Sequence, residues 1–290
     1  MRFIFFLALA WSASLQALEV VDDTGTTIQL HKPAQRIISL APHVTELLFE
    51  AGADHKIIGV VQYSNYPNAA KLIPQVGGYQ KLDMELIVSM QPDLIIGWQT
   101  GNRKSELDKL KQLGFKVFLT EPRQLPDIAG LLERFGVLTG SETLARQAAA
   151  RFMQQYQLLR QRYLDKEPLR AFYQIWDQPL MTINGQHLIS DVMRLCGLEN
   201  VFAHIDTLVP RIDLESVLEA DPQLIIAGGV GRLRPDWARQ WKRWPDLSAT
   251  RLNAFLDINP DIIQRHSQRI LQGAEQLCQQ AEQLRQRIYQ

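Results

Sequence analysis

One stretch of this chain occurs twice, and that repetition limits the possible folds more than any other feature. Residues 82–98, LDMELIVSMQPDLIIGW, return as residues 212–228, IDLESVLEADPQLIIAG, at a constant offset of 130 positions (212 minus 82). An Asp, a Glu, a Pro and a Leu-Ile-Ile triplet match without a gap. The match indicates an internal duplication, so the chain is expected to fold as two similar halves.

Each copy of the repeat has the pattern of a short helix followed by a buried strand. Asp83 and Asp213 suit the N-cap position, because their carboxylates can accept backbone N–H groups that lack a partner within the helix. Glu85 and Glu215 follow in the first turn, where the helix dipole favours negative charge. The Pro ends the helix, and the apolar run behind it suits a strand buried on both faces of a parallel sheet. The repeat therefore predicts two α/β lobes that carry Glu85 and Glu215 at matching positions.

The segments around the two copies alternate between strand and helix patterns. In the first half we expect a hairpin at 18–33, strands at 36–40, 57–61, 93–98 and 116–120, and helices at 41–51, 84–91 and 103–113. In the second half we expect strands at 170–176, 180–183 and 254–256, the repeated helix and strand at 213–227, and helices at 189–195, 234–244 and 260–289. This alternation predicts Rossmann-like lobes with parallel-type sheets and helices on both faces.

A segment without Gly or Pro separates the two halves. It starts at the N-cap candidate Ser141, is rich in Ala and Gln, and predicts one helix over 141–166. Such a helix would be on the order of 35–40 Å long. The expected order is a signal peptide at 1–17, an N-terminal lobe at 18–140, a rigid connecting helix at 141–166 and a C-terminal lobe at 167–290. A rigid connection predicts little hinge closure around a ligand.

The N-terminus has the layout of a secretory signal peptide. A charged start precedes apolar residues 3–11 and small or polar residues 12–17, so cleavage after Ala17 is expected. A membrane anchor is the alternative, but the apolar run is short for a bilayer span. In an exported chain the only two cysteines, Cys196 and Cys278, are expected to form a disulfide, with two buried free thiols as the alternative. A formal net charge of zero gives no argument for a nucleic-acid partner.

The sequence contains no persuasive enzymatic or metal-binding motif. GxSxG, HExxH and GxxxxGK[ST] are absent, and the six histidines lack ligand spacing. Aromatic residues instead gather near the ends of the expected strands. Tyr63 and Tyr66 follow the strand at 57–61, Trp98 and Trp176 end their strands, and Tyr79 stands just before the first copy of the repeat. Ligands of open α/β sheets bind beyond the carboxyl ends of the strands, where aromatic rings suit a large, flat, partly polar ligand. The pattern favours a binding cleft over core packing, and no catalytic residue is assigned.

The two glutamates of the repeat suggest a partner as well as a fold. Glu85 and Glu215 could simply complement their helix dipoles on a solvated face. Their matched positions would also suit a two-fold partner that carries one basic site per subunit.

These residues together resemble the periplasmic substrate-binding proteins of ABC importers in which one helix joins two lobes, and among them the cobalamin-binding members. The resemblance covers nearly the whole chain after residue 17. Besides the repeat at 82–98, it rests on RIISLAPHVTELLFEAG at 36–52, VQYSNYP at 61–67, LCGLENVF at 195–202 and AEQLCQQ at 274–280. It implies a class III fold with a helical backbone, a monomer in the periplasm, no catalysis, no cofactor, and cobalamin as transported cargo. It also implies that Cys196 pairs with Cys278.

The resemblance assigns roles to individual positions. Ligand contacts are implied for Tyr63, Tyr79, Trp98, Asp261, Ile262, Ile263, Gln264 and Arg265, to which the strand-end pattern adds Trp176. Glu85 and Glu215 match the two glutamates that engage arginines on the membrane subunits of the transporter.

The chain also departs from the cobalamin-binding pattern. Val209 stands near the position of a cleft Trp, the 261–265 segment keeps only its flanking Asp and Arg, and the hairpin at 18–33 is more typical of haem and siderophore binders. Haem or an iron–siderophore is therefore the alternative cargo. An exported α/β hydrolase or metal-dependent enzyme is the distant alternative.

Overall fold

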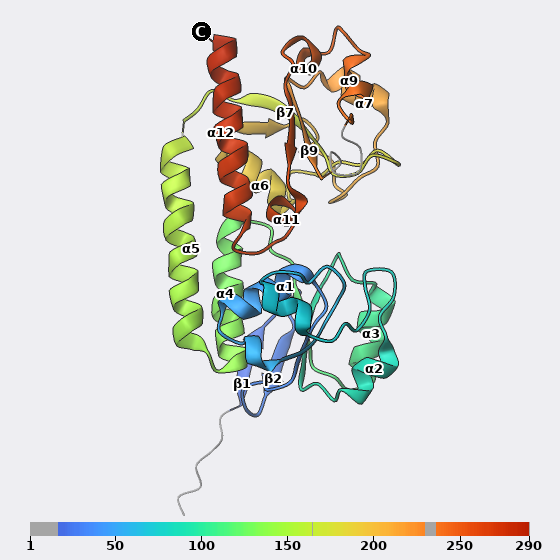
Figure 1. Ribbon diagram of the computed structural model, residues 1–290, viewed down its shortest axis with the longest axis vertical. Coiled ribbons are helices and arrows are strands. Elements are labelled where there is room, and N and C mark those ends of the chain that lie inside the picture. Colours follow the sequence, from blue (N-terminus) through green and yellow to red (C-terminus); the bar gives the residue numbers. More distant parts are fainter. Residues whose placement is uncertain (1–16, 164, 230–235, 290) are drawn as a thin grey trace, which may run out of the picture.

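Two α/β lobes are stacked along the long axis of the molecule, and long helices run along one side of both (Figure 1). The computed structural model describes residues 17–163, 165–229 and 236–289. The expected signal peptide, apart from Ala17, lies outside these residues. The long helices are α4 (Leu125–Thr139), α5 (Glu142–Tyr163) and α12 (Ile270–Tyr289).

The N-terminal lobe is built on a four-stranded parallel sheet with the order β4-β3-β5-β6. Its strands are β3 (Ile37–Ser39), β4 (Ile57–Val60), β5 (Leu94–Trp98) and β6 (Val117–Thr120). Its helices are α1 (Pro42–Glu50), α2 (Met84–Ser89) and α3 (Lys104–Gln112). Successive strand side chains point to opposite faces: Ile37 packs in the core cluster that includes α1 and α4, whereas Ile38 packs in the cluster that includes α2 and α3.

The expected hairpin is formed by β1 (Leu18–Val21) and β2 (Thr27–Leu30), which pair antiparallel. It lies against β6, where the backbone N–H of Asp23 donates to Leu119 at 3.0 Å. The Asp22 carboxylate accepts from the Leu119 N–H at 3.1 Å. The hairpin therefore belongs to the N-terminal lobe.

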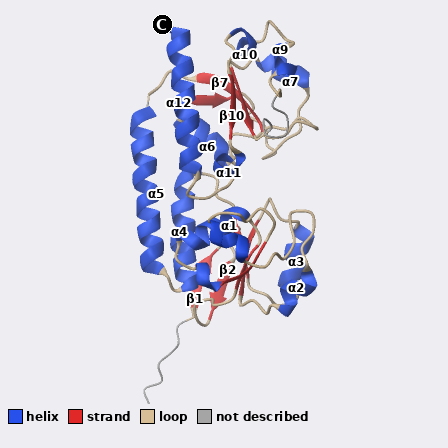
Figure 2. Cartoon of the chain, in the orientation of Figure 1, coloured by secondary structure: helices blue, strands red, loops and turns tan. Residues whose placement is uncertain are grey.

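The C-terminal lobe repeats this plan with the strand order β10-β9-β7-β8, again parallel (Figure 2). Its strands are β7 (Leu169–Gln174), β8 (Leu198–Asn200), β9 (Leu224–Gly228) and β10 (Phe255–Ile258). Its helices are α6 (Leu188–Leu195), α7 (Leu214–Ala220), α9 (Arg239–Lys242), α10 (Ser248–Arg251) and α11 (Pro260–Ile263). The two-lobe parallel α/β prediction is confirmed.

The duplicated stretch forms the same helix and strand in both lobes. Asp83 caps α2 by accepting from the Leu86 N–H at 3.0 Å, and Asp213 caps α7 by accepting from the Ser216 N–H at 2.8 Å. The strands that follow, β5 and β9, are central in their sheets. The two copies of the repeat therefore form the same helix–strand unit at corresponding positions in the two lobes, which explains why they match without a gap.

The connection between the lobes contains more than the one helix that the sequence indicates. The chain leaves β6 and reaches the C-terminal lobe at once, where the Leu125 N–H donates to Asp191 near the start of α6 at 2.8 Å. It returns along α4, turns at Gly140 with a positive φ of 70°, and then runs back along α5. The expected helix over 141–166 is observed as α5, ending at Tyr163. Both helices span the junction.

Two expected elements are wrong. The helix over 260–289 is interrupted between α11 and α12, because residues 264–269 leave the helical path to contact the N-terminal lobe. The strand over 180–183 is absent, because only Met181 pairs, in isolated bridges to Trp176 and Arg211. The expected helix over 234–244 shortens to α9 within the described residues, and residues 230–235 lie outside them.

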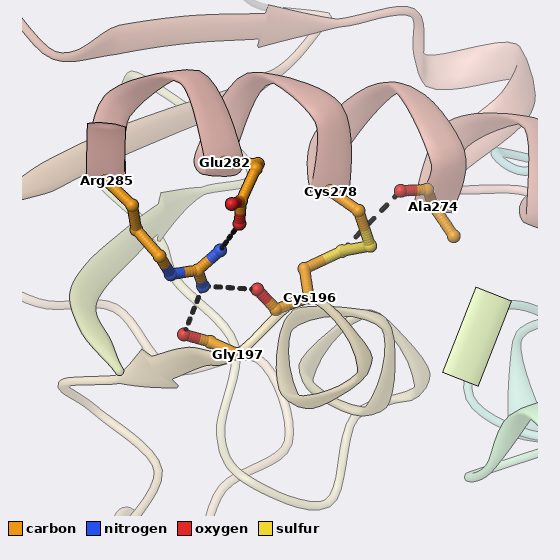
Figure 3. The surroundings of a disulfide bond; sticks show 6 residues. All are labelled: Cys196, Gly197, Ala274, Cys278, Glu282 and Arg285. Atoms are coloured by element: carbon orange, nitrogen blue, oxygen red, sulfur yellow. Dashed lines mark hydrogen bonds and ion pairs between the residues drawn. A yellow bond between two sulfur atoms is a disulfide. The ribbon is translucent and has the colours of Figure 1, made fainter. Parts of the chain in front are cut away.

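The predicted disulfide between Cys196 and Cys278 is present and joins the end of α6 to α12 (Figure 3). Arg285, two turns further along α12, donates to the backbone oxygens of Cys196 and Gly197 (Figure 3). These bonds satisfy carbonyls at the C-terminal end of α6 that have no partner within the helix. Among the described residues, no helix is both long and apolar enough to cross a bilayer.

Candidate ligand-binding site

The carboxyl ends of the strands in both lobes face the junction between the lobes. Helix α1 directly follows β3, and α11 directly follows β10, so both helices begin at the carboxyl edge of their own sheet. The segment 264–269 beyond α11 bonds to α1 of the other lobe. The edge at which open α/β sheets bind ligands is therefore the edge where these two lobes meet.

A fully buried carboxylate, that of Glu46 on α1, holds this junction together. Its Oε1 accepts from Arg265 Nη1 at 2.7 Å and from Arg269 Nη2 at 2.6 Å. Its Oε2 accepts from Ser267 Oγ at 2.5 Å and from Arg269 Nε at 3.0 Å. A buried charge is tolerated only when it is paired and its hydrogen bonds are satisfied. Four bonds from the opposite lobe meet both requirements.

Three of the aromatic side chains expected to bind ligand are largely exposed. The exposed fractions are 74% for Tyr63, 76% for Tyr79 and 51% for Trp176. Exposed aromatic rings of this size represent apolar area available for contact with a ligand. Tyr63 also has a φ of 66°, in the left-handed region that a bulky residue rarely adopts.

The loop that carries Tyr63 is anchored at two residues that follow the tyrosine, Ser64 and Tyr66. Thr45 Oγ1, on α1, lies 3.1 Å from Ser64 Oγ and 2.8 Å from Ser39 Oγ, in a buried chain of hydroxyl groups. The guanidinium of Arg269 lies 3.9 Å from the ring centroid of Tyr66. Tyr66 therefore packs against a cation of the other lobe, and Tyr63 is the more exposed of the two.

The remaining predicted contacts are buried to different degrees. Trp98 is half-buried, and Asp261 and Gln264 are half-buried as well. Ile262, Ile263 and Arg265 are buried, the two isoleucines in the core and Arg265 in the pair with Glu46. Within the 261–265 segment, polar Asp261 and Gln264 are thus the more accessible side chains.

Beneath Trp98 lies a cluster of buried imidazoles that the sequence did not indicate. The ring of His266 lies 5.1 Å from Trp98, 5.5 Å from His43 and 5.6 Å from His187, between ring centroids. Trp98 Nε1 and His266 Nδ1 are buried without a hydrogen-bond partner among the described residues. His43 and His187 are 144 positions apart (187 minus 43), and His187 and His266 are 79 apart (266 minus 187), so no local spacing indicates the cluster.

Burial controls the charge of these histidines. It lowers the pKa of His43 and His187 well below the usual value, with the neighbouring His266 adding to the effect. Burial, with Arg123, lowers the pKa of His266 to about 4. All three are therefore neutral near pH 7. Within the described part of the chain, no group of histidine, cysteine or acidic side chains could hold a metal ion.

The two glutamates of the repeat lie at matching exposed places. Glu85 and Glu215 are each in the first turn of their helix, α2 and α7. In the view of Figure 1 both helices lie on the side of the molecule away from α5. Each lobe therefore carries one exposed glutamate in a helix that lies on the side opposite α5.

Comparison with known proteins shows which family has this architecture. A family model for periplasmic binding proteins matches residues 37–251. A vitamin B12-binding protein of Vibrio cholerae serotype O1 is 36% identical over 253 residues, which cover 85% of this chain and 88% of that protein. The crystal structure of the periplasmic vitamin B12-binding protein BtuF of Vibrio cholerae superposes with a TM-score of 0.81 at 35% identity, covering 87% of this chain and 98% of that one.

The same fold also occurs in a more distant protein whose name gives heme as the ligand. The periplasmic heme-binding protein HutB of Vibrio cholerae superposes with a TM-score of 0.72 at 19% identity, covering 84% of this chain and 98% of that chain. At that identity the likeness concerns the fold alone.

Proposed function

Because the chain belongs to the periplasmic binding protein family, we propose that it captures cobalamin between its two lobes and delivers it to an inner-membrane ABC transporter. Family membership makes the chain a binding protein and not an enzyme. Cobalamin is then transported cargo and not a cofactor. The observation that carries the proposal is the 36% identity to a vitamin B12-binding protein over 85% of the chain.

The exposed aromatic rings support this cargo. Cobalamin is a large and flat molecule, and Tyr63, Tyr79 and Trp176 present exposed, broad apolar faces with polar tips. Trp98 would line the floor, and Asp261 and Gln264 of the 261–265 segment would supply polar contacts from the opposite lobe. The remaining members of that segment, Ile262, Ile263 and Arg265, would support the contact surface from within.

Calorimetric titration with cyanocobalamin tests the cargo. Binding with a dissociation constant below about 1 µM is expected, and no binding at that level would contradict the proposal. Hemin is the matched competitor. A Soret band that appears with hemin and disappears in Tyr63→Phe or Tyr79→Phe would support haem as cargo instead, since an axial tyrosine would then hold the iron.

Delivery requires a docking surface, and we propose that Glu85 and Glu215 form it together. Each is exposed, one lies on each lobe, and basic sites on the two membrane subunits would complement them. The protein would act as a monomer whose two similar lobes each contact one subunit of a two-fold symmetric partner. We further propose a cleaved signal peptide at 1–17, with the lobes at 18–140 and 167–290 joined by 141–166.

Charge reversal at the docking glutamates separates delivery from capture. Glu85→Arg combined with Glu215→Arg should reduce cobalamin uptake by cells that depend on this protein by about tenfold or more, because like charges would face each other at the interface. Cobalamin affinity of the purified variant should stay unchanged. Glu199→Arg is the control, since Glu199 is exposed on the same lobe but lies on β8 and not on α7. Normal uptake by the double variant would contradict the docking proposal.

A further inference from the structure

We propose that Glu46 is the positioning residue of the cargo site, which holds the Tyr63 loop and the 261–265 segment in one register across the two lobes. This inference rests on the proposed function, because it concerns the geometry in which cobalamin would be bound. Glu46 itself is fully buried and would not touch the cargo.

The contacts on the C-terminal lobe provide the first half of the argument. Arg265 joins Glu46 through Nη1 at 2.7 Å and Asp261 through Nη2 at 2.9 Å. One guanidinium therefore links the buried carboxylate of one lobe to the first residue of the candidate contact segment on the other. A planar guanidinium forms such bonds with fixed geometry, so the position of Asp261 depends on the position of Glu46.

The contacts on the N-terminal lobe provide the second half. Arg269 binds both oxygens of Glu46 and covers the ring of Tyr66, three residues after Tyr63. Thr45, the neighbour of Glu46 on α1, bonds to Ser64, the residue after Tyr63. The loop is thus fixed from both sides by groups that meet at one turn of α1.

The backbone conformation of Tyr63 explains why the loop needs these contacts. A non-glycine residue at a φ of 66° is strained and keeps that conformation only when its surroundings enforce it. The anchors at Ser64 and Tyr66 are the enforcing contacts that the structure provides. Loosening the Glu46 network would release Arg269 from its place over Tyr66, and Tyr63 could then relax away from its binding orientation.

A matched control lies one turn further along α1. Glu50 also forms an ion pair that leaves the helix, with Arg151 of α5 at 2.8 Å. Its side chain is 30% exposed, compared with 0% for Glu46, and its partner does not belong to either candidate contact segment. Glu50→Gln therefore removes an equal charge from the same helix without disturbing the proposed register.

Rapid-mixing kinetics with cyanocobalamin test the proposal on Glu46→Gln, Ser267→Ala, Arg269→Lys and Glu50→Gln. The first three should raise the dissociation constant, mainly through faster dissociation. Glu46→Gln should raise it by about tenfold or more, because Arg269 loses the carboxylate that it binds and Arg265 keeps only Asp261. Glu50→Gln should stay within about twofold of the parent protein. Ser267→Ala and Arg269→Lys create no unpaired buried charge, so they remain informative if Glu46→Gln does not fold.

Hydrogen exchange of the cargo-free proteins separates positioning from a merely structural role. Faster exchange confined to residues 62–67 and 261–268 in Glu46→Gln supports the inference, whereas faster exchange throughout the chain contradicts it. Removing the disulfide provides a second control, because it lowers stability without touching the network. Absence of cobalamin binding by the parent protein would overturn the proposed function, while parent-like affinity in all network variants would overturn this inference alone.

Discussion

Tyr63 combines a strained backbone with a largely exposed aromatic ring. The strain lowers the stability of the fold, whereas the exposed ring is available to bind a ligand. A left-handed conformation costs a bulky residue on the order of 1 kcal/mol, which glycine would not lose. A ring that is 74% exposed contributes little to the core. Strain without a structural benefit is a property of functional positions.

Tyr63→Gly is therefore expected to weaken cobalamin binding while leaving stability nearly unchanged. Relief of strain is offset by the larger entropy of glycine in the unfolded chain, about 0.5–1 kcal/mol. Affinity should fall by about tenfold or more, because one aromatic face of the site is lost. Calorimetric titration and thermal unfolding measure the two quantities. A large loss of stability with intact affinity would show that Tyr63 has a structural role instead.

The buried histidines predict a loss of stability in mild acid. Their pKa values are lowered by burial, so below pH 6.5 the unfolded chain binds protons that the folded protein excludes. For His266 the window runs from about 6.5 in the unfolded chain down to about 4 in the folded protein. Full stability is present above this window and is lost progressively as the pH falls through it.

Urea unfolding at pH 7, 6 and 5 measures this effect. Each histidine should reduce the free energy of unfolding by up to about 1.4 kcal/mol per pH unit below 6.5. In His266→Asn the free energy of unfolding should fall less steeply with pH, by up to about 1.4 kcal/mol per pH unit, because one buried histidine is removed. A free energy of unfolding that does not change between pH 7 and pH 5 would contradict the buried, neutral state of the cluster.

Single residues also mark where sequence-based prediction ended. Glu85, Glu215, Tyr63 and Tyr79 can be proposed as site residues from the sequence, because each stands in a local pattern, a first helical turn or a loop near the repeat. Glu46 lies in the stretch 36–52 that resembles the family, but its neighbours in the sequence indicate no role for it. Its bond to Arg265 spans 219 positions, and no local pattern can indicate such a partner.

Among the secondary-structure elements, the duplicated helix and strand could be predicted almost residue by residue. Capping, dipole and proline rules act within a few residues, so they are visible in the sequence. The helix pattern over 260–289 did not predict the structure in the same way. Its helical spacing is continuous, but the segment folds as two helices, α11 and α12. Bonds from Arg265 and Ser267 to Glu46 of the other lobe outweigh local helical preference there. Tertiary contacts of this kind are not encoded in periodicity.

The disulfide is an element-level tie whose removal should affect stability and not binding. It closes a loop with a sequence separation of 82 between α6 and α12. Cys196→Ala with Cys278→Ala should lower the free energy of unfolding by about 4 kcal/mol in the loop-entropy description. Urea unfolding checks this value, and titration with cyanocobalamin should give the parent affinity. Reduced affinity in the double variant would mean that α12 transmits disorder to the site through residues 264–269.

For the whole molecule, the question is whether the lobes move relative to each other. The sequence indicated one stiff connecting helix and therefore little closure. The structure adds α4, which also spans the junction, and the Glu46 network, which joins α1 of one lobe to residues 264–269 of the other through side-chain bonds. The connecting helices and the Glu46 network together should resist rotation of one lobe against the other, because hinge closure requires a few residues about which a lobe can turn freely.

Spin labels at Lys111→Cys and Glu219→Cys would measure this rigidity, since both sites are exposed and lie on different lobes. The distance between the labels should shift by less than about 2 Å when cyanocobalamin is added. With the additional Glu46→Gln substitution the distance distribution should broaden, because α4 and α5 remain while the second attachment is lost. A shift of several ångström in the parent protein would show hinge closure. A narrow distribution in the Glu46→Gln background would mean that the helices alone set the separation of the lobes, and that the buried carboxylate acts only on the local geometry of the site.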